Sequence, residues 1–339
     1  MYGFGIIGCG MIAKTHISAI ADIADAKLVG VFDKNQAAGN KFAQENNTIF
    51  FESLEDMLSN EEIDIVTICT PSGLHADLTI KALEAGKNVV VEKPMALTAE
   101  DCDRVIEAEK NSGKICAVVS QLRFSDVAHQ VKNAIADGKL GDIVEVGLHM
   151  KYHRDEEYYS SSNWRGTYSM DGGGALMNQG IHGVDMLINF LGMPESVFAF
   201  CRTKRHNIEV EDTAVAVLEY KNGPIGVIEA TTSVNPGYPR QLEICGTKGS
   251  IILEENTIKS WDIDGETMDS ETLQSRSFND PAAISHYGHK LEFEDLIDAI
   301  KNNRKPLIDT TEGKKSVELI RAIYESSQNN KKIIIKGDN

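Results

Sequence analysis

The first residues whose spacing suggests chemistry are glycines near the N-terminus. Gly8, Gly10 and Ala13 form the pattern G-x-G-x-x-A between a β-rich run and a helical stretch. Gly8 permits a tight turn, Gly10 lets the backbone approach a pyrophosphate, and Ala13 lets the helix pack closely on the strand. The pyrophosphate would lie at the positive N-terminus of that helix. We therefore expect Gly8, Gly10, Met11 and Ile12 to bind a dinucleotide, and a purely structural turn is the alternative for the spacing alone.

An acidic residue follows the second β-rich run, which ends at Phe32. A carboxylate at this position accepts hydrogen bonds from the ribose hydroxyls of adenosine and repels a 2′-phosphate. Asp33 therefore predicts NAD as the cofactor. The neighbouring Lys34 offers some affinity for phosphate, so NADP stays as the alternative.

A lysine follows the β-rich run 88–92 directly. Ligands of open parallel sheets bind at the carboxyl ends of the strands. An ammonium group there can hydrogen-bond a substrate hydroxyl and stabilise the charge of a developing alkoxide. Lys93 is therefore a candidate catalytic residue, and the alternative is a solvated surface lysine.

The elements that must position these residues begin with a regular alternation. Over the first third of the chain, short β-rich runs are separated by helical stretches, which predicts βαβ units and a parallel sheet. Runs such as 66–68 and 89–91 are apolar without alternation, as expected for strands covered on both faces. We predict an α/β Rossmann domain over residues 1–122.

The pattern changes after about Phe124. Strand-like runs now follow one another as hairpins bounded by turn signals, and one helical stretch, 175–191, interrupts them. Two further helical stretches, 284–302 and 311–329, close the chain. We predict an α+β domain with a large, mostly antiparallel sheet over residues 123–339.

Composition excludes several classes of function. Of 339 residues, 42% are hydrophobic and 25% are charged, as in ordinary globular proteins. The net charge of -17 argues against nucleic acid, which requires clustered Lys and Arg, and against an anionic membrane surface. No apolar run approaches the roughly 18–20 residues that span a bilayer. The six cysteines form no zinc spacing or disulfide framework, so we expect no metal and a reducing, cytoplasmic location.

Two strand-end motifs resemble a known family. The segment 70–75 reads Thr-Pro-Ser-Gly-Leu-His, and 92–94 reads Glu-Lys-Pro. With the glycine pattern, they resemble the Gfo/Idh/MocA (glucose–fructose oxidoreductase / inositol dehydrogenase) family over essentially the whole chain. The resemblance implies a cis-proline at 94, with Lys93 pointing between cofactor and substrate. It also implies a second domain whose sheet roofs the nicotinamide and mediates contacts in a homodimer or homotetramer. The residues it places at the cofactor are Thr70, Pro71, His75, Glu92, Lys93 and Gln121.

A glycine-led helix carries the second part of the resemblance. Residues 172–174 are glycines, which allow close backbone approach at a helix start. Asn178 and His182 lie four residues apart and so share one helical face. In the family, an Asp-x-x-x-His pair at these positions faces the substrate, and the His is the general acid/base for the hydroxyl that becomes a ketone. A packed helix histidine is the alternative for His182.

This sequence departs from the family pattern by carrying Asn178 where the Asp is expected. An amide can orient a hydroxyl but carries no charge, which leaves His182, with a reference pKa of about 6.5, as the proton carrier. Family members with Asn here include dehydrogenases that oxidise C3 of UDP-N-acetylglucosaminuronate. For Asp185, three residues after His182, we expect a structural role.

A loop upstream of this helix is rich in aromatic and cationic residues. Guanidinium groups suit carboxylates or phosphates, and Trp and Tyr rings suit sugar faces. A negatively charged substrate such as a uronic acid or nucleotide sugar would fit. The alternative is a surface loop whose cations pair with the acidic run 155–157. The candidate substrate-binding residues are Lys93, Arg123, Lys151, Tyr152, Arg154, Trp164, Arg165, Asn178 and His182.

Together these residues predict an NAD-dependent oxidoreductase. It would move a hydride between nicotinamide and a secondary hydroxyl or ketone of a sugar, sugar acid or nucleotide sugar. Lys93 would polarise the oxygen, His182 would take the proton, and Asn178 would position the sugar. The alternatives are an inositol or free-aldose dehydrogenase, a nicotinamide-dependent glycosidase or lyase with transient oxidation, and a non-catalytic cofactor-binding regulator.

Overall fold

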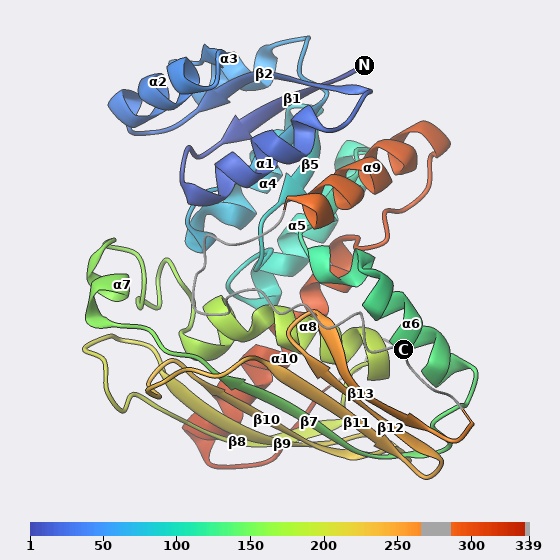
Figure 1. Cartoon of the computed structure of the whole chain (residues 1–339). Helices are drawn as coiled ribbons and strands as arrows, with labels where there is room; N and C mark the ends of the chain where they lie inside the picture. Colours follow the sequence, from blue (N-terminus) through green and yellow to red (C-terminus); the bar gives the residue numbers. More distant parts are fainter. Residues whose placement is uncertain (266–285, 336–339) are drawn as a thin grey trace. The chain divides into compact units, whose positions relative to one another are not determined.

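A computed structural model describes residues 1–265 and 286–335 of the chain (Figure 1). By the contacts between its residues, the chain divides into two compact units. The first comprises Met1–Gln121 with Ile284–Lys314, and the second comprises Leu122–Ala283 with Lys315–Asn339. The sequence predicts one continuous second domain over 123–339, whereas 284–314 groups with the first unit. These residues group with the first unit because the helix 287–302 packs on its core through Phe293.

The first unit is built on a six-stranded parallel sheet. The strand order is β3-β2-β1-β4-β5-β6. Strands β2 and β3 are added on one side of β1, and β4, β5 and β6 on the other, so the order reverses between β1 and β4. Every residue of β4 is buried, which explains why that run is apolar without alternation. The predicted parallel α/β sheet is confirmed. The strands are β1 (Tyr2–Ile7), β2 (Ala26–Phe32), β3 (Ile49–Phe50), β4 (Ile65–Ile68), β5 (Asn88–Val91) and β6 (Cys116–Val118).

Helices of this unit follow the strands, and several begin at side-chain caps. Ser53 accepts a hydrogen bond from the backbone N–H of Asp56, and Thr98 accepts one from that of Asp101. The last helix comes from the distant C-terminal part of the sequence, where Phe293 stacks on Phe4 with ring centroids 5.7 Å apart. The helices are α1 (Met11–Ala21), α2 (Gln36–Glu45), α3 (Leu54–Ser59), α4 (His75–Glu84), α5 (Ala99–Ser112) and α9 (Tyr287–Asn302).

An eight-stranded sheet forms the second unit. Its order is β13-β12-β11-β7-β10-β9-β8-β14, and every described pairing is antiparallel except that of β7 with β10. The predicted α+β architecture is confirmed. The strands are β7 (Ile143–Lys151), β8 (Ser196–Arg202), β9 (Thr213–Glu219), β10 (Ile225–Thr231), β11 (Gln241–Gly246), β12 (Gly249–Glu254), β13 (Thr257–Ile263) and β14 (Ile333–Ile334).

Helices α8 and α10 lie on one face of this sheet (Figure 1). Side chains of α10 fasten it to β8: Ser326 accepts a hydrogen bond from the backbone N–H of Ala199, and Ser327 accepts one from that of Cys201. The predicted helix over 175–191 is a π-helical turn, η3 (Ala175–Gly180), followed by α8 (Ile181–Leu191). The other helices are α6 (Asp126–Ala136), α7 (Glu156–Ser160) and α10 (Thr310–Asn329).

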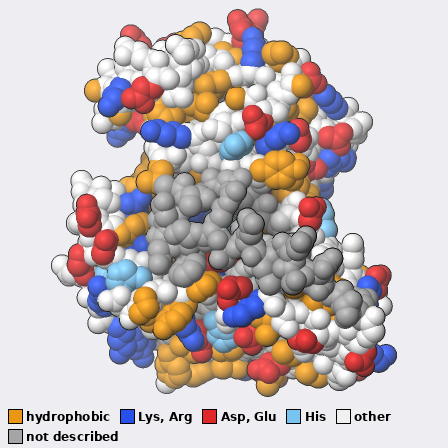
Figure 2. Space-filling model, in the orientation of Figure 1, with side chains coloured by type: hydrophobic (Ala, Val, Ile, Leu, Met, Phe, Trp, Pro, Cys, Tyr) orange, Lys and Arg blue, Asp and Glu red, His pale blue; other side chains and the backbone are white. Residues whose placement is uncertain are grey.

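The other face of the sheet exposes apolar side chains. Phe200 on β8, Val217 on β9 and Ile225 on β10 are 51%, 55% and 63% exposed. Hydrophobic atoms gather along the lower edge of Figure 2, where Figure 1 draws these strands. Among the described residues, no helix is long and apolar enough to cross a membrane.

Candidate functional site

The glycine turn between β1 and α1 has the geometry that dinucleotide binding requires. Gly8 has a φ of +96°, and a Cβ there would lie 2.8 Å from the backbone of Cys69. Gly10 is exposed, and the nearest atom to a Cβ built on it is 4.0 Å away. No side chain caps the start of α1 at Met11 and Ile12. The first turn of α1 therefore presents backbone N–H groups beside an open glycine.

Asp33 is fixed to this turn through its carboxylate. Its Oδ2 accepts a hydrogen bond of 2.8 Å from the backbone N–H of Cys9, and its Oδ1 accepts one of 2.8 Å from Asn35. Each carboxylate oxygen can accept a second hydrogen bond. The side chain is thus held beside the glycine turn and keeps the capacity to accept from ribose hydroxyls.

His75 joins the turns that follow β4 and β5. Its Nδ1 lies 2.7 Å from the carbonyl oxygen of Pro94, and its Nε2 lies 2.9 Å from that of Thr70. Burial lowers the pKa of this imidazole, and the two carbonyl contacts oppose that effect. Both ring nitrogens thus contact backbone oxygens, which braces the turns that carry Thr70 and Lys93, and the prediction that His75 also lines the cofactor stays a prediction.

Lys93 stands on a turn that is anchored from beneath. Its peptide bond to Pro94 is cis, as the resemblance implied. The Oε2 of Glu92 accepts a hydrogen bond of 3.2 Å from the backbone N–H of Lys93, and its Oε1 lies 2.8 Å from Nε2 of His16. Burial would raise the pKa of Glu92, but its contacts with His16 and His289 hold it well below the usual value. Glu92 is therefore a buried anchor for the turn.

Glu92 belongs to a buried cluster of potential metal ligands, and the prediction that the protein binds no metal stays a prediction. His16, Glu92 and His289 are buried, and their ligand atoms lie within 4.8 Å of one another. They come from α1, the end of β5 and α9, so no sequence spacing could reveal them. His16 also bonds the hydroxyl of Thr67 at 2.6 Å, which makes the cluster part of the core beneath Lys93.

Two polar atoms of the first unit fit a bound cofactor. The hydroxyl of Thr70 and the Oε1 of Gln121 are buried and have no hydrogen-bond partner among the described residues. Unpaired buried polar atoms are rare in folded proteins because desolvation is costly. Both residues follow carboxyl ends of parallel strands, where NAD would supply the missing partners. The residues present therefore fit the cofactor that the glycine turn predicts.

Asn178 and His182 occupy the junction between η3 and α8 in the second unit. The side-chain N–H of Asn178 donates to Oδ1 of Asp171 at 2.5 Å, and its Oδ1 accepts from Gln179 at 2.6 Å. The amide is thus oriented by both neighbours. The carboxylate that the family pattern expects at 178 is replaced by Asn178, and Asp171 supplies a carboxylate next to it. Asp171 opens the glycine block in the sequence, and that position is the signal that could have found it.

Two predicted substrate cations are paired with carboxylates. Arg123 is buried and donates from Nε and Nη2 to the carboxylate of Asp185 at 2.9 and 2.7 Å. Lys151 forms an ion pair of 2.7 Å with Glu229. The sequence predicts that Arg123, Lys151, Arg154 and Arg165 bind an anionic substrate. The first two already have carboxylate partners, and the assignment of all four stays a prediction. The alternative pairing with residues 155–157 does not occur for Arg123 or Lys151.

Arg154 and Arg165 belong to a cluster of aromatic rings and arginines. Arg154 donates from Nε and Nη2 to Oε1 of Gln179, at 3.1 and 2.7 Å. The guanidinium of Arg165 lies 4.4 Å from the ring centroid of Tyr158 and 5.4 Å from that of Trp164. Gln179 donates to the hydroxyl of Tyr158 at 2.7 Å, which ties the cluster to Asn178.

Tyr152 contributes to the cluster as a buried ring rather than as an acid. The guanidinium of Arg154 lies 5.7 Å from its ring centroid. Burial raises the pKa of Tyr152 to about 12. Its hydroxyl therefore stays protonated at neutral pH.

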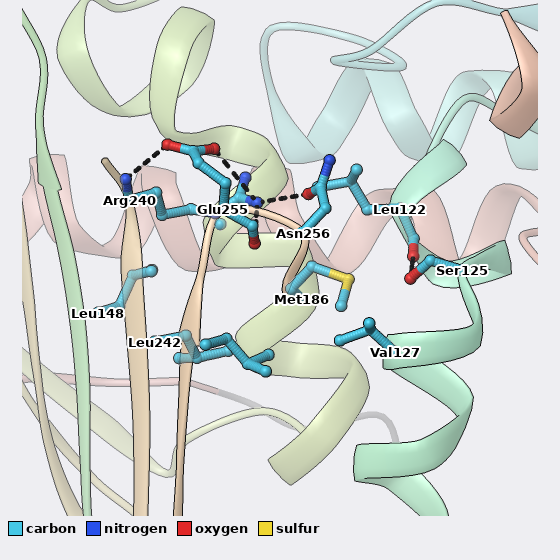
Figure 3. Close-up of a pocket in the computed structure, with 11 residues that line it drawn as sticks. Leu122, Ser125, Val127, Leu148, Met186, Arg240, Leu242, Glu255 and Asn256 are labelled. Atoms are coloured by element: carbon cyan, nitrogen blue, oxygen red, sulfur yellow. Dashed lines mark hydrogen bonds and ion pairs between the residues drawn. The ribbon is translucent and has the colours of Figure 1, made fainter. Parts of the chain in front are cut away.

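A small pocket of the second unit is lined by residues of α6, α8, β7, β11 and β12, including Gly183, the residue after His182 (Figure 3). Its volume of about 10 Å³ is room for one water molecule and not for a sugar. Arg240 closes it by donating to the carbonyl of Glu255 and to Oδ1 of Asn256, at 2.8 and 2.9 Å, as Figure 3 shows. The pocket is therefore no substrate site.

The glycine turn follows β1, and the strand order of the sheet reverses between β1 and β4. These two features define the first unit as a dinucleotide-binding Rossmann fold. Comparison with known proteins agrees. Residues 2–120 match the description "Oxidoreductase family, NAD-binding Rossmann fold", and residues 128–252 match "GFO/IDH/MocA C-terminal domain". The chain belongs to the Gfo/Idh/MocA family. At the level of that family it is an NAD(P)-dependent dehydrogenase acting on a CH–OH group of a sugar.

Three known proteins are similar to this chain in sequence, and two of them have solved structures. The WlbA dehydrogenase of Bordetella pertussis, solved with NADH and UDP-GlcNAcA, is 35% identical with a TM-score of 0.89, covering 99% of each chain. The WlbA dehydrogenase of Chromobacterium violaceum, solved with the same two ligands, is 34% identical with a TM-score of 0.90, covering 100% of this chain and 97% of that one. Inositol 2-dehydrogenase of Salmonella typhimurium is 30% identical, covering 72% of this chain and 71% of that protein.

Proposed function

We propose that this protein is an NAD-dependent dehydrogenase of a nucleotide-sugar acid, oxidising a secondary ring hydroxyl reversibly to a ketone. One observation of the site carries the choice of substrate. The Nε of Arg165 is buried without a hydrogen-bond partner among the described residues. Within that same part of the chain, no carboxylate pairs with Arg165 or Arg154. An uncompensated guanidinium beside aromatic rings suits a carboxylate on a sugar.

The two WlbA structures support this substrate class. Both relatives match the chain over nearly its whole length and were solved with NADH and UDP-GlcNAcA. In the proposed reaction, His182 takes the hydroxyl proton, and the ammonium group of Lys93 hydrogen-bonds the oxygen as its charge develops. Asn178, fixed by Asp171 and Gln179, orients the sugar. Bound NAD supplies the hydride acceptor.

NAD is proposed over NADP because of Asp33. Its carboxylate lies beside the glycine turn and would repel a 2′-phosphate. Gly8, Gly10, Met11, Ile12, Thr70, Pro71 and Gln121 complete the proposed cofactor site. Titration of both cofactors tests the assignment, since tighter binding of NADP than of NAD would overturn it.

The test of the proposed function is NADH formation with matched sugars. The panel comprises UDP-GlcNAcA, neutral UDP-GlcNAc, a free uronic acid and myo-inositol. We expect turnover with the nucleotide-sugar acid. Arg165→Gln should raise its KM roughly 10–100-fold, because a lost charge-assisted hydrogen bond is worth about 1.5–3 kcal/mol. Arg104→Gln, which removes an exposed arginine on α5, is the control and should leave KM unchanged.

A second candidate function is inositol or free-aldose oxidation, which the inositol 2-dehydrogenase relative favours. Preference for myo-inositol, with no effect of Arg165→Gln, would replace the first proposal. A glycosidase or lyase with transient oxidation would consume the sugar without net NADH. A cofactor-binding regulator would bind NADH and turn over none of the panel.

We also propose a homodimer or homotetramer formed through the exposed face of the eight-stranded sheet. Phe200, Val217 and Ile225 lie on three adjacent strands of that face. Contiguous exposed apolar side chains of this kind mark association surfaces.

A cytoplasmic location is part of the proposal. All six cysteines lie in the described part of the chain and none forms a disulfide, as a reducing compartment requires.

A further inference from the structure

A buried carboxylate lies directly beneath the glycine-led turn. Glu211 Oε2 accepts a hydrogen bond of 2.9 Å from the backbone N–H of Gly174, and its Oε1 accepts one of 2.9 Å from that of Leu176. Its own carbonyl oxygen accepts a third, of 3.0 Å, from the backbone N–H of Ala175. Three consecutive backbone N–H groups at the start of η3 thus bond to one residue.

Tyr324 of α10 extends this hold by one residue. Its hydroxyl donates to Oε1 of Glu211 at 2.9 Å and accepts from the backbone N–H of Met177 at 3.3 Å. The next residue along the chain is Asn178. The bonded backbone therefore runs without interruption from Gly174 to the residue that we place at the sugar.

The contact distances explain why glycines precede this turn. A Cβ on Gly174 would lie 1.8 Å from the carbonyl oxygen of Glu211, and a Cβ on Gly173 would lie 2.2 Å from the hydroxyl of Tyr324. Neither position can accept a side chain without moving Glu211 or Tyr324. The glycine run, which the sequence associates only with close backbone approach, is shaped to fit these two residues.

Burial raises the pKa of Glu211 to about 7, although its hydrogen bonds lower it in part. The titratable groups that face it are Tyr324 from α10 and Cys201 from β8. Burial raises the pKa of Tyr324 far above its usual value and that of Cys201 to about 12, so both are neutral near pH 7. The neighbouring Asp212 turns its carboxylate to the backbone of residues 204–206 instead. Of Glu211, Tyr324 and Cys201, only Glu211 gains or loses a proton near pH 7.

We propose that Glu211 is a positioning residue, which fixes the start of η3 and thereby the placement of Asn178 and His182. The inference rests on the proposed function for its catalytic consequence. Glu211 touches backbone and Tyr324, so it acts through the helix and not on the sugar. Its role for the second unit parallels that of Glu92, which holds the turn bearing Lys93 in the first.

The test compares Glu211→Gln and Tyr324→Phe with the wild-type protein. Glutamine keeps the shape but turns an NH₂ group toward donors, and phenylalanine removes only the bonds to Glu211 and Met177. We expect Glu211→Gln to lower kcat roughly 10–100-fold, since small displacements of reacting groups have effects of this size. Tyr324→Phe should lower kcat less. The Kd for NADH should be unchanged in both, and Glu209→Gln, an exposed neighbour, is the matched control.

Hydrogen exchange of the backbone amides separates this inference from the proposed function. Exchange at Gly174, Leu176 and Met177 should be faster in Glu211→Gln than in wild type or Glu209→Gln. Unchanged exchange would overturn the inference, as would faster exchange with unchanged kcat. If Glu211→Gln does not fold, the same exchange measurement on Tyr324→Phe tests the inference, and unchanged exchange there would overturn it. If the wild-type protein oxidises no sugar, the proposed function fails, and the exchange data still decide whether Glu211 holds the turn.

Discussion

Arg123 and Asp185 form a buried, two-pronged ion pair in the second unit, with hydrogen bonds of 2.9 and 2.7 Å. Asp185 lies in α8, three residues after His182. The pair therefore fastens the helix that carries the proposed proton carrier. The sequence places Arg123 at the substrate, and its carboxylate partner lies 62 residues away, where no local pattern could indicate it.

Breaking this pair should be costly for stability. We expect Asp185→Asn to lower the free energy of unfolding by roughly 3–5 kcal/mol, because Arg123 is left charged and buried. Urea unfolding followed by circular dichroism measures the change. The double variant Arg123→Met with Asp185→Leu should recover much of the loss. A single variant as stable as wild type would contradict the structural role of the pair.

Lys93 should matter for turnover and little for cofactor affinity. We expect Lys93→Ala to reduce kcat by about 10²–10³-fold, the size typical of losing one hydrogen-bond donor to a developing oxyanion. The Kd for NADH, followed by fluorescence, should stay nearly constant. Lys81→Ala, an exposed lysine of α4, serves as the control. Full activity of Lys93→Ala would remove Lys93 from the mechanism.

The carboxyl group of Asp212 should make the free energy of unfolding depend on pH in the acidic range. Burial would raise the pKa of its carboxyl, but backbone N–H groups of Lys204, Arg205 and His206 donate to it and lower it to about 2. A folded pKa below the unfolded value of about 3.9 stabilises the protein above pH 4, and this contribution is lost as the pH falls toward 2.

Asp212→Asn should therefore be less stable than wild type at pH 7 by about 2 kcal/mol, with the difference shrinking below pH 4. Urea midpoints at pH 7, 4 and 3 measure it. A difference that stays constant over this range would show that the carboxylate charge is unimportant.

The exposed face of the eight-stranded sheet should respond to charge. We expect Val217→Asp to convert the proposed oligomer to monomers in sedimentation velocity, because it places carboxylates into an apolar interface. Ile49→Asp is the matched control, since Ile49 is also 55% exposed but lies on β3 of the first unit. If the wild-type protein is a monomer, this part of the proposal is wrong.

Much of the fold was readable because its elements follow simple patterns. The buried parallel strands are apolar runs, and the predicted runs 63–70 and 88–92 extend beyond the observed β4 and β5 by at most two residues at either end. The strand β3 is too short, at two residues, to give a pattern. The apolar pattern does not predict the helix α3, although Ser53 and Asp56 have the spacing of an N-terminal cap.

The chemistry of the site was less readable, because partners decide what a charged side chain does. Arg165 keeps an unpaired Nε, whereas Lys151 is paired with Glu229 on a neighbouring strand. Both are basic residues of the same sequence region. Glu211 and Tyr324 lie 113 residues apart and carry no motif, so only the three-dimensional fold brings them to the glycine turn.

The stacking of Phe293 on Phe4 has a consequence for the order in which the protein can be made. A ribosome releases the β1 strand first, but the side chain that covers Phe4 is synthesised almost 300 residues later. Until then, part of the first core is without its cover. The nascent chain must carry this exposed surface through the synthesis of nearly the whole second unit, and a fragment ending near residue 122 would carry it permanently.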